Sequence, residues 1–339
     1  MRYKYHFTPY SGWMNDPNGL IFHNGEYHMY FQYNPDSVEW GNISWGHAVS
    51  KDLMNWHMEG VVLRPDEHGM IFSGSAIADG DTIYYFYTAA RKGHFTQRLA
   101  VSHDCGYTLL KDPDFEVEMI CPENRDPKVI YHKETDSYIM CLWLEENDFA
   151  IFRSDKVDGR YEMTQRFTLP GGFECPNLFE CGDSWFIWTA DGYYYPGTFD
   201  GYRFVWNGVR HEAYRDKIPY AAQIFSGTPR CIMIPWLRTP TVADKWTGMM
   251  GIPRLLEAVE NKTYRRAASQ NDREDYLLRM IPIVTDTHPL YKCGNLNVLL
   301  NSNQSAIPGC NVSSSDIIKD ENVIERTDTD KTRLSVMWE

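Results

Sequence analysis

The sequence lacks three features that would each point to a particular class of protein. Acidic residues outnumber basic ones by 46 to 33, which gives a net charge of −13. Nucleic acid needs basic patches to bind its phosphates, so we expect no nucleic-acid partner. No apolar run approaches the length of a transmembrane helix, so we expect no membrane span.

Cysteine motifs are also missing, although cysteine itself is not. The eight cysteines include no Cys-x-x-Cys pair and no Cys/His cluster with zinc-ligand spacing. We therefore expect no metal site and no cofactor. Several cysteines, Cys141 and Cys231 among them, lie in apolar segments where a free thiol behaves as a small hydrophobe. This usage, with no apolar leader after Met1, predicts a cytoplasmic protein, and secretion stays open if a signal peptide has been removed.

Aromatic residues are plentiful, at 14% of the chain with 22 Tyr and 11 Trp, whereas long helix-forming runs are scarce. Aromatic and β-branched side chains suit half-buried, pleated surfaces. A turn followed by an aromatic, apolar strand recurs five times, at intervals of about 45 to 57 residues, a length that suits one four-stranded propeller blade. The expected strands span residues 27–33, 83–87, 138–144, 185–188 and 231–234. The repeat predicts an all-β fold, a five-bladed β-propeller.

The pattern breaks near residue 285. Beyond it the sequence is rich in Asn, Ser and charge around one candidate strand at 296–300. We therefore predict a five-bladed propeller over residues 1–285 and a short C-terminal extension over 286–339. About 55 residues are too few for a β-sandwich, which takes about 100.

The stretch from Trp13 to Gly19 contains the first candidate for catalysis. Pro17 keeps the preceding residue out of the helical region, so we expect Asp16 to end an extended segment. Pro17, Asn18 and Gly19 should then form a tight turn. Taken alone, this is an ordinary turn aspartate.

Two more acids strengthen the case for chemistry. Arg125-Asp126-Pro127 repeats the Asp-Pro pair, and Glu174 lies two residues before Pro176. Each acid alone is typical of a solvated loop. Together they supply what glycoside hydrolysis requires: a nucleophile, a general acid and a group that holds substrate hydroxyls.

On these motifs the chain resembles glycoside hydrolase family 32, the invertase, inulinase and levanase family of β-fructosidases. The resemblance lies in seven blocks in the family's order, at residues 13–19, 30–35, 45–50, 72–75, 125–127, 174–175 and 220–223. It implies the same five-bladed propeller. Family members usually carry a full C-terminal β-sandwich, which this chain is expected to lack.

The resemblance also implies roles for individual residues. Asp16 matches the nucleophile and is expected to stay ionised through hydrogen bonds, Glu174 matches the general acid and base, and Asp126 matches the transition-state stabiliser. The expected substrate-binding residues are Asn15, Gln32, Trp40, Phe72, Ser73, Arg125, Tyr220 and Trp236. Many relatives have an acid two positions before the matching tyrosine, where this chain has Ile218, so recognition of the leaving group stays open.

The resulting prediction is a retaining, exo-acting β-fructofuranosidase on sucrose or short fructans. A fructosyltransferase and a sucrose-6-phosphate hydrolase are alternatives, and a family 43-like arabinan enzyme fits the 13–19 block less well. A catalytically silent, carbohydrate-binding propeller is the alternative from another class, and the three intact acids argue against it. The expected partner is a small or oligosaccharide substrate, and the sequence does not predict an oligomeric state.

Overall fold

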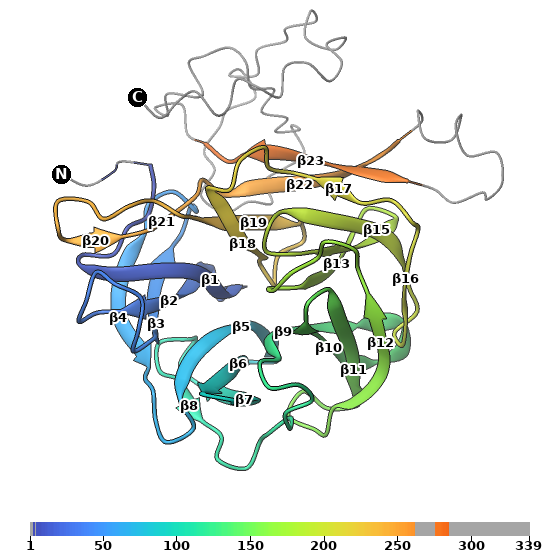
Figure 1. Ribbon diagram of the computed structural model, residues 1–339, viewed down its shortest axis with the longest axis horizontal. Coiled ribbons are helices and arrows are strands. Elements are labelled where there is room, and N and C mark those ends of the chain that lie inside the picture. The colour runs from blue at the N-terminus through green and yellow to red at the C-terminus, as the bar shows by residue number, and fades with distance from the viewer. Residues whose placement is uncertain (1–2, 4, 262–274, 285–339) are drawn as a thin grey trace, which may run out of the picture.

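The computed structural model describes residues 3, 5–261 and 275–284. Within these ranges its regular elements are strands, apart from one 3-10 helix at Lys133–Thr135. No helix in the described residues is long and apolar enough to cross a membrane. The strands form five sheets, here named blades 1 to 5 in chain order, around a common centre (Figure 1).

The first three blades are each built on four consecutive antiparallel strands. Blade 1 contains β1 (Gly12–His23), β2 (Glu26–Asn34), β3 (Ser44–Ser50) and β4 (His57–Leu63). Blade 2 contains β5 (Met70–Asp79), β6 (Thr82–Arg91), β7 (His94–Ser102) and β8 (Leu110–Lys111). Blade 3 contains β9 (Arg125–His132), β10 (Ser137–Glu145), β11 (Asp148–Ser154) and β12 (Glu162–Thr168).

The last two blades are less regular. Blade 4 contains β13 (Asn177–Cys181), β14 (Ser184–Trp188), β15 (Tyr193–Phe199), β16 (Phe204–Trp206) and β17 (His211–Glu212). Blade 5 contains β18 (Pro219–Ile224), β19 (Ile232–Leu237), β21 (Met249–Met250), β22 (Arg254–Glu260) and β23 (Tyr276–Pro282). The short β20 (Trp246–Thr247) leaves blade 5 and pairs with β1 instead.

The five-bladed propeller predicted from the repeat is confirmed. The five aromatic strands expected from the sequence fall on the second strand of each blade, β2, β6, β10, β14 and β19. The predicted C-terminal extension, with its candidate strand at 296–300, lies outside the described residues. The boundary near residue 285 therefore stays a prediction.

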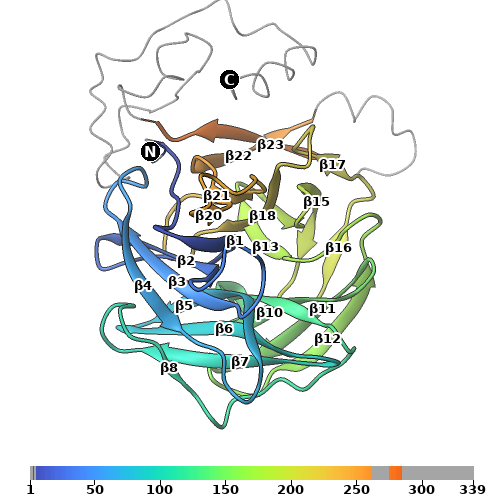
Figure 2. The ribbon, with the colours of Figure 1, turned by 60° about the vertical axis from the view of Figure 1, so that its left-hand side comes forward.

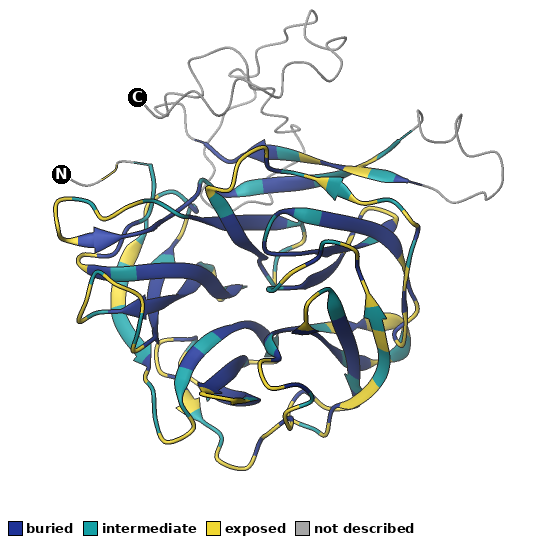
Figure 3. Cartoon of the chain, in the orientation of Figure 1, coloured by how far each residue is buried: buried dark blue, intermediate teal, exposed yellow. Residues whose placement is uncertain are grey.

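The first strand of each blade lies at the centre of the ring. β5 packs against both β1 and β9, and β1 also contacts β18. These inner strands are almost wholly buried, whereas the outer strands β4 and β12 carry exposed positions (Figure 3). Every inner strand starts at the same end of the axis and runs along it. Residues at the five strand starts therefore meet at that end.

The ring closes between blade 1 and blade 5. At one end, the Gly12 amide donates to the Lys245 carbonyl at 2.8 Å, and β20 pairs in parallel with the start of β1. At the other end, the Phe22 amide donates to Ser226 and the Ser226 amide donates to Leu20, each at 2.9 Å. The closure therefore rests on backbone hydrogen bonds at both ends of β1.

Aromatic side chains fill the space between blades 1 and 2. Trp45, Tyr30 and Tyr85 are fully buried in one core cluster between blades 1 and 2. The two phenols pair at 2.7 Å, and the Tyr30 hydroxyl also lies 2.6 Å from the Gly106 carbonyl. Burying these hydroxyls is tolerable because each has a hydrogen-bond partner.

The turn predicted at Pro17-Asn18-Gly19 is wrong. β1 continues past these residues to His23, with register shifts on either side of Pro17 and Asn18, and the chain turns only at Asn24-Gly25. Gly19 has a φ of +53°, and a Cβ there would lie 2.9 Å from the Tyr30 ring. The local signals of a turn therefore mark bulges in a central strand, which aim Asp16 at the axis.

A buried carboxylate fastens blade 5 to blade 4. Asp275, which is 1% exposed, accepts hydrogen bonds from His211 on β17 at 2.8 Å and from Asn261 at 2.8 Å. Burial raises the pKa of Asp275, but the bonds from His211 and Asn261 outweigh it and leave the pKa below its usual value. The strands β17, β22 and β23 lie side by side in both ribbon views (Figure 2).

Asp275→Ala is expected to lower the free energy of unfolding by about 3 kcal/mol, because it leaves the partly buried donors of His211 and Asn261 without their charged acceptor. Urea denaturation at neutral pH measures the loss. Asp183→Ala, at an exposed position in the β13–β14 turn, is the matched control and should change stability by less than about 0.5 kcal/mol. Equal effects of the two substitutions would contradict the role of Asp275.

Candidate active site

Three carboxylates predicted from the sequence meet at one end of the propeller axis. Asp16 lies on β1, Asp126 on β9, and Glu174 just before β13. The thiol of Cys175 joins two of them, since its Sγ is 3.6 Å from Asp16 Oδ2 and 3.4 Å from Asp126 Oδ2. Arg125, next to Asp126 in the chain, is bonded to Glu174. The acids of blades 1, 3 and 4 thus form one connected network.

Asp16 is 8% exposed and held by neutral donors. Ser73 Oγ donates to Asp16 Oδ2 at 2.7 Å, Gln32 Nε2 donates to the same oxygen at 3.2 Å, and Asn15 Nδ2 lies 3.4 Å from Oδ1. Gln32 also bonds to the Ser73 hydroxyl. Trp13 Nε1 donates to Asn15 Oδ1 at 2.8 Å and so fixes the Asn15 amide.

Burial decides the charge of Asp16. It raises the pKa of this carboxyl to about 6, although the hydrogen bond from Ser73 lowers it, and the nearby charge of Glu174 adds to the rise. The expectation that hydrogen bonds keep Asp16 ionised is therefore corrected, because burial of this carboxyl outweighs them and raises its pKa. It still carries its charge above about pH 6.

Asp126 is held through both its backbone amide and its carboxylate. Its amide donates to Thr88 Oγ1 at 3.0 Å, and its Oδ2 accepts from the Cys175 amide at 3.0 Å. Burial raises the pKa of Asp126 to about 7, the charge of Arg125 lowers it, and the charges of Glu174 and Asp16 raise it again. Asp126 therefore shares one titration with its neighbours rather than titrating alone.

Glu174 is held by a cation and a phenol. Its Oε1 accepts from Arg125 Nε at 3.1 Å and from Nη2 at 2.5 Å, and its Oε2 accepts from the Tyr220 hydroxyl at 2.5 Å. The guanidinium of Arg125 lies 4.1 Å from the Trp143 ring centre. The arginine is thus fixed by a stacked aromatic below and a carboxylate in front.

The backbone is strained at these side chains. Asp126, Glu174, Cys175 and Ala221 have φ values of 68°, 48°, 43° and 46°. Left-handed backbone costs a non-glycine residue on the order of 1–3 kcal/mol, and such residues concentrate at functional sites. All four lie within the network or directly beside it. The strained backbone therefore lowers the stability of the fold but positions these side chains.

The aromatic residues predicted for substrate binding divide into two groups. Trp40 is 52% exposed and meets Phe72 edge to face at 6.0 Å, beside Ser73. Trp236 is 8% exposed and lies between Trp13, at 6.1 Å, and Tyr220, at 6.3 Å. Tyr220 reaches Glu174 directly, whereas Trp236 packs behind it.

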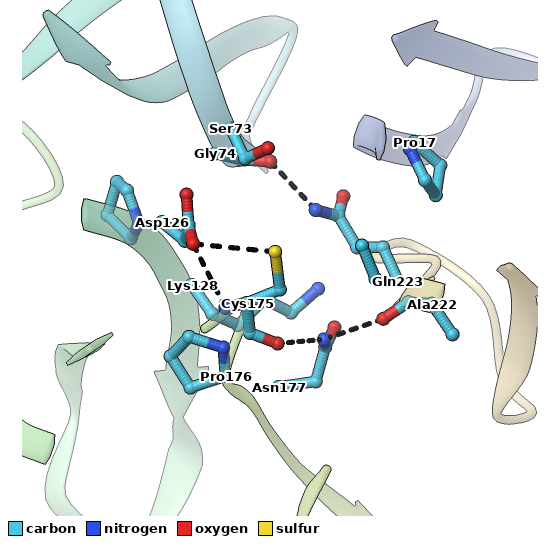
Figure 4. Close-up of a pocket in the computed structure, with 12 residues that line it drawn as sticks. Pro17, Ser73, Gly74, Asp126, Lys128, Cys175, Pro176, Asn177, Ala222 and Gln223 are labelled. Carbon is cyan, nitrogen blue, oxygen red and sulfur yellow. Dashed lines mark hydrogen bonds between the residues drawn. The ribbon is translucent and has the colours of Figure 1, made fainter. Parts of the chain in front are cut away.

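A small pocket lies beside Asp126 and Cys175 (Figure 4). Its lining comes from all inner strands but is concentrated in blades 3 to 5. The residues that line it are Pro17, Ser73, Gly74, Asp126, Pro127, Lys128, Cys175, Pro176, Asn177, Ala221, Ala222 and Gln223.

Lys128, which lines this pocket, was not predicted from the sequence. Its ammonium is buried and donates to the Ile224 carbonyl at 2.7 Å, and burial lowers the pKa of Lys128 to about 7. A signal was present in the sequence, because Asp126 and Lys128 are two residues apart on a strand and so share a face. Gln223, by contrast, lies where its sequence block predicted, and bridges the Leu20 amide at 3.0 Å and the Gly74 carbonyl at 2.8 Å.

No group of three or more His, Cys, Asp or Glu side chains among the described residues is arranged to hold a metal ion. The network consists of carboxylates with amide, hydroxyl, thiol, phenol and guanidinium partners. Such a set suits the binding of sugar hydroxyls and proton transfer.

A β-propeller that gathers three carboxylates at one end of its axis, among amides and aromatics, has the architecture of a glycoside hydrolase catalytic domain. The family model described as the glycosyl hydrolases family 32 N-terminal domain matches residues 6–267. The chain therefore belongs to glycoside hydrolase family 32.

Comparison with individual proteins agrees with this family. The levanase of Bacillus subtilis is 31% identical over 308 residues, which cover 79% of this chain and 44% of the levanase. An extracellular exo-inulinase of Aspergillus niger is 30% identical over 370 aligned residues, covering 86% of this chain and 67% of the inulinase. The structure of a β-fructofuranosidase from Schwanniomyces occidentalis, complexed with fructosyl-erythritol, superposes with a TM-score of 0.74 at 27% identity, covering 84% of this chain and 63% of that one. The chain thus spans less than half of the levanase and about two thirds of the other two.

Proposed function

We propose that the protein hydrolyses terminal β-D-fructosyl linkages in sucrose or short fructans, as a retaining, exo-acting β-fructofuranosidase. The observation that carries the proposal is the single network of Asp16, Asp126 and Glu174, contributed by three blades and joined through Cys175 and Arg125. Relatives described as levanase and exo-inulinase support the fructoside as the substrate class.

In the proposed reaction Asp16 attacks the anomeric carbon of the terminal fructosyl unit, and Glu174 gives a proton to the departing oxygen. A covalent fructosyl-enzyme results. Glu174 then takes a proton from water, which attacks the same carbon and releases Asp16. The two inversions leave the fructose with its original β configuration.

The surrounding residues have supporting parts in this scheme. Ser73, Gln32 and Asn15 hold the carboxylate of Asp16 toward the axis. Asp126 binds fructose hydroxyls, and Arg125 with Tyr220 orients Glu174. Trp40 and Phe72 offer an apolar wall beside the pocket.

Release of fructose from sucrose by the purified protein tests the proposal. A panel of sucrose, phosphorylated sucrose, short inulin-type fructans and levan then ranks the substrates, and exo action predicts that fructose appears as the first product from every chain length. Longer fructans made at high sucrose would instead indicate a fructosyltransferase. Binding of fructans without turnover would favour a non-catalytic propeller and overturn the proposal.

The pH dependence of kcat/KM follows from the buried acids. Since Asp16 must be ionised to attack, and its pKa is raised to about 6 beside Asp126 at about 7, activity should rise between about pH 6 and pH 7 on the acid side. Ser73→Ala removes a hydrogen bond that lowers the pKa of Asp16, so its rise should move to higher pH. A pH–rate profile of both proteins on sucrose measures this, and an unmoved or lower rise in the variant would contradict it.

We also propose a reducing, cytoplasmic setting. The six cysteines in the part of the chain that the structure describes are all free, which supports this location.

A further inference from the structure

Two free thiols meet where blade 4 packs against blade 5. Cys181 is the last residue of β13, and Cys231 directly precedes β19. Cys231 Sγ lies 3.0 Å from the Glu180 carbonyl, and Cys181 Sγ lies 3.6 Å from the Leu256 carbonyl. The Leu256 amide in turn donates to the Cys231 carbonyl at 2.8 Å. Cys181 belongs to a buried core cluster and Cys231 packs against it, and the two thiols lie close enough to shift each other's pKa.

The pair lies at the far end of the blades from the proposed active site. β13 starts just after Glu174 and ends at Cys181, and the turn between β18 and β19 brings Cys231 to the same end. The Tyr220–Glu174 bond spans the same pair of blades at the opposite end. The thiols therefore take no part in the proposed hydrolysis.

The surroundings of the pair favour thiol chemistry. The contact with the Cys231 thiol lowers the pKa of Cys181 against the effect of burial, and the same contact raises the pKa of Cys231, so the thiolate of the pair forms on Cys181. A lower pKa means more thiolate, which is the reactive form. Cys231 is half-buried, so a small oxidant reaches the pair from solvent.

We propose that Cys181 and Cys231 are a redox-active dithiol, which a peroxide converts into a reversible disulfide between blades 4 and 5. The thiolate of the pair displaces hydroxide from hydrogen peroxide and becomes a sulfenic acid. The second thiol attacks that sulfur, the S–S bond forms, and water leaves. One thiolate, one thiol and one peroxide thus give one disulfide, one water and one hydroxide.

The disulfide would close a loop of about 50 residues that contains β14 to β18, and so restrict the unfolded chain. We expect the oxidised protein to melt about 5 °C higher than the reduced protein. Dithiothreitol should return the melting temperature to its starting value.

The test treats the reduced, full-length protein with a small excess of hydrogen peroxide, blocks the remaining thiols and maps disulfides by mass spectrometry. We expect a Cys181–Cys231 linked peptide together with the rise in melting temperature. Cys231→Ser should show neither. Cys105→Ser, which removes another half-buried thiol on blade 2, is the matched control and should show both.

Two results would overturn the proposal. One is oxidation of Cys231 to a sulfinic acid, or no oxidation at all, without the linked peptide. The other is a rise in melting temperature that Cys231→Ser retains, which would assign the stabilisation to different cysteines. Since fructose release is not part of the readout, failure here leaves the proposed hydrolysis unaffected.

Discussion

Asp16→Ala is expected to lower kcat on sucrose by on the order of 10⁵-fold or more, because without this carboxylate no fructosyl-enzyme can form. The loss should be as large on a fructoside with an activated leaving group, since the missing step is attack and not protonation. Initial rates of fructose release from both substrates measure it. Continued turnover of the activated substrate, or an α-configured first product from the wild type, would contradict the mechanism.

Asp16→Asn serves as the folding control for this variant. The folded-state pKa of Asp16 is raised from 3.8 to about 6, so the ionised carboxylate destabilises the folded protein by about 2 to 3 kcal/mol at neutral pH. The amide, being neutral, should therefore be inactive and yet more stable than the wild type. This gain in stability should shrink as the pH falls through 6 toward 3.8, because Asp16 of the wild type then also becomes neutral. A less stable Asp16→Asn protein at pH 7 would show that burial does not strain this site.

Glu174→Ala is expected to lower kcat/KM on sucrose by about 10²- to 10⁴-fold, the usual contribution of a general acid. The expected pattern differs from that of Asp16, since formation of the intermediate from an aryl fructoside with a good leaving group needs no proton and should suffer least. A burst of released phenol measures this step separately from hydrolysis of the intermediate.

Tyr220→Phe is the matched control for Glu174. It removes the 2.5 Å bond to Glu174 Oε2 but keeps the carboxyl group and the aromatic ring, so a smaller loss is expected. Equal losses of Glu174→Ala on sucrose and on the aryl fructoside would show that Glu174 does not protonate the leaving group.

The sequence predicted the propeller because the repeat itself carries the information. One aromatic strand per blade, opened by a turn, gives the number of blades. The same reading failed locally at Pro17-Asn18-Gly19, where turn residues lie inside the central strand β1. Turn propensity describes a few residues in isolation, whereas here the pairing of β1 with β2 overrides it.

The sequence predicted which residues form the site, but it did not predict their charge states. Motifs identify Asp16, Asp126 and Glu174, but the pKa of Asp16 depends on how much water the fold removes around it. Lys128 shows the same limit, because a lysine in a strand is normally exposed and only the closed ring buries it. The Cys181–Cys231 contact likewise needs two blades to pack before the thiols meet.

The active site can form only once the ring closes through β1 and β20 during folding. The partners that seal it lie at opposite ends of the described ring in sequence, with Gly12 bonded to Lys245. Such non-local pairing is the slow part of folding, and an unclosed ring exposes the edges of its terminal blades to other chains. Since Asp16 stands on the first strand and Tyr220 on the last blade, recovery of activity during refolding should lag behind recovery of strand content. Activity would thus measure closure of the ring, whereas strand content would measure only formation of the separate blades.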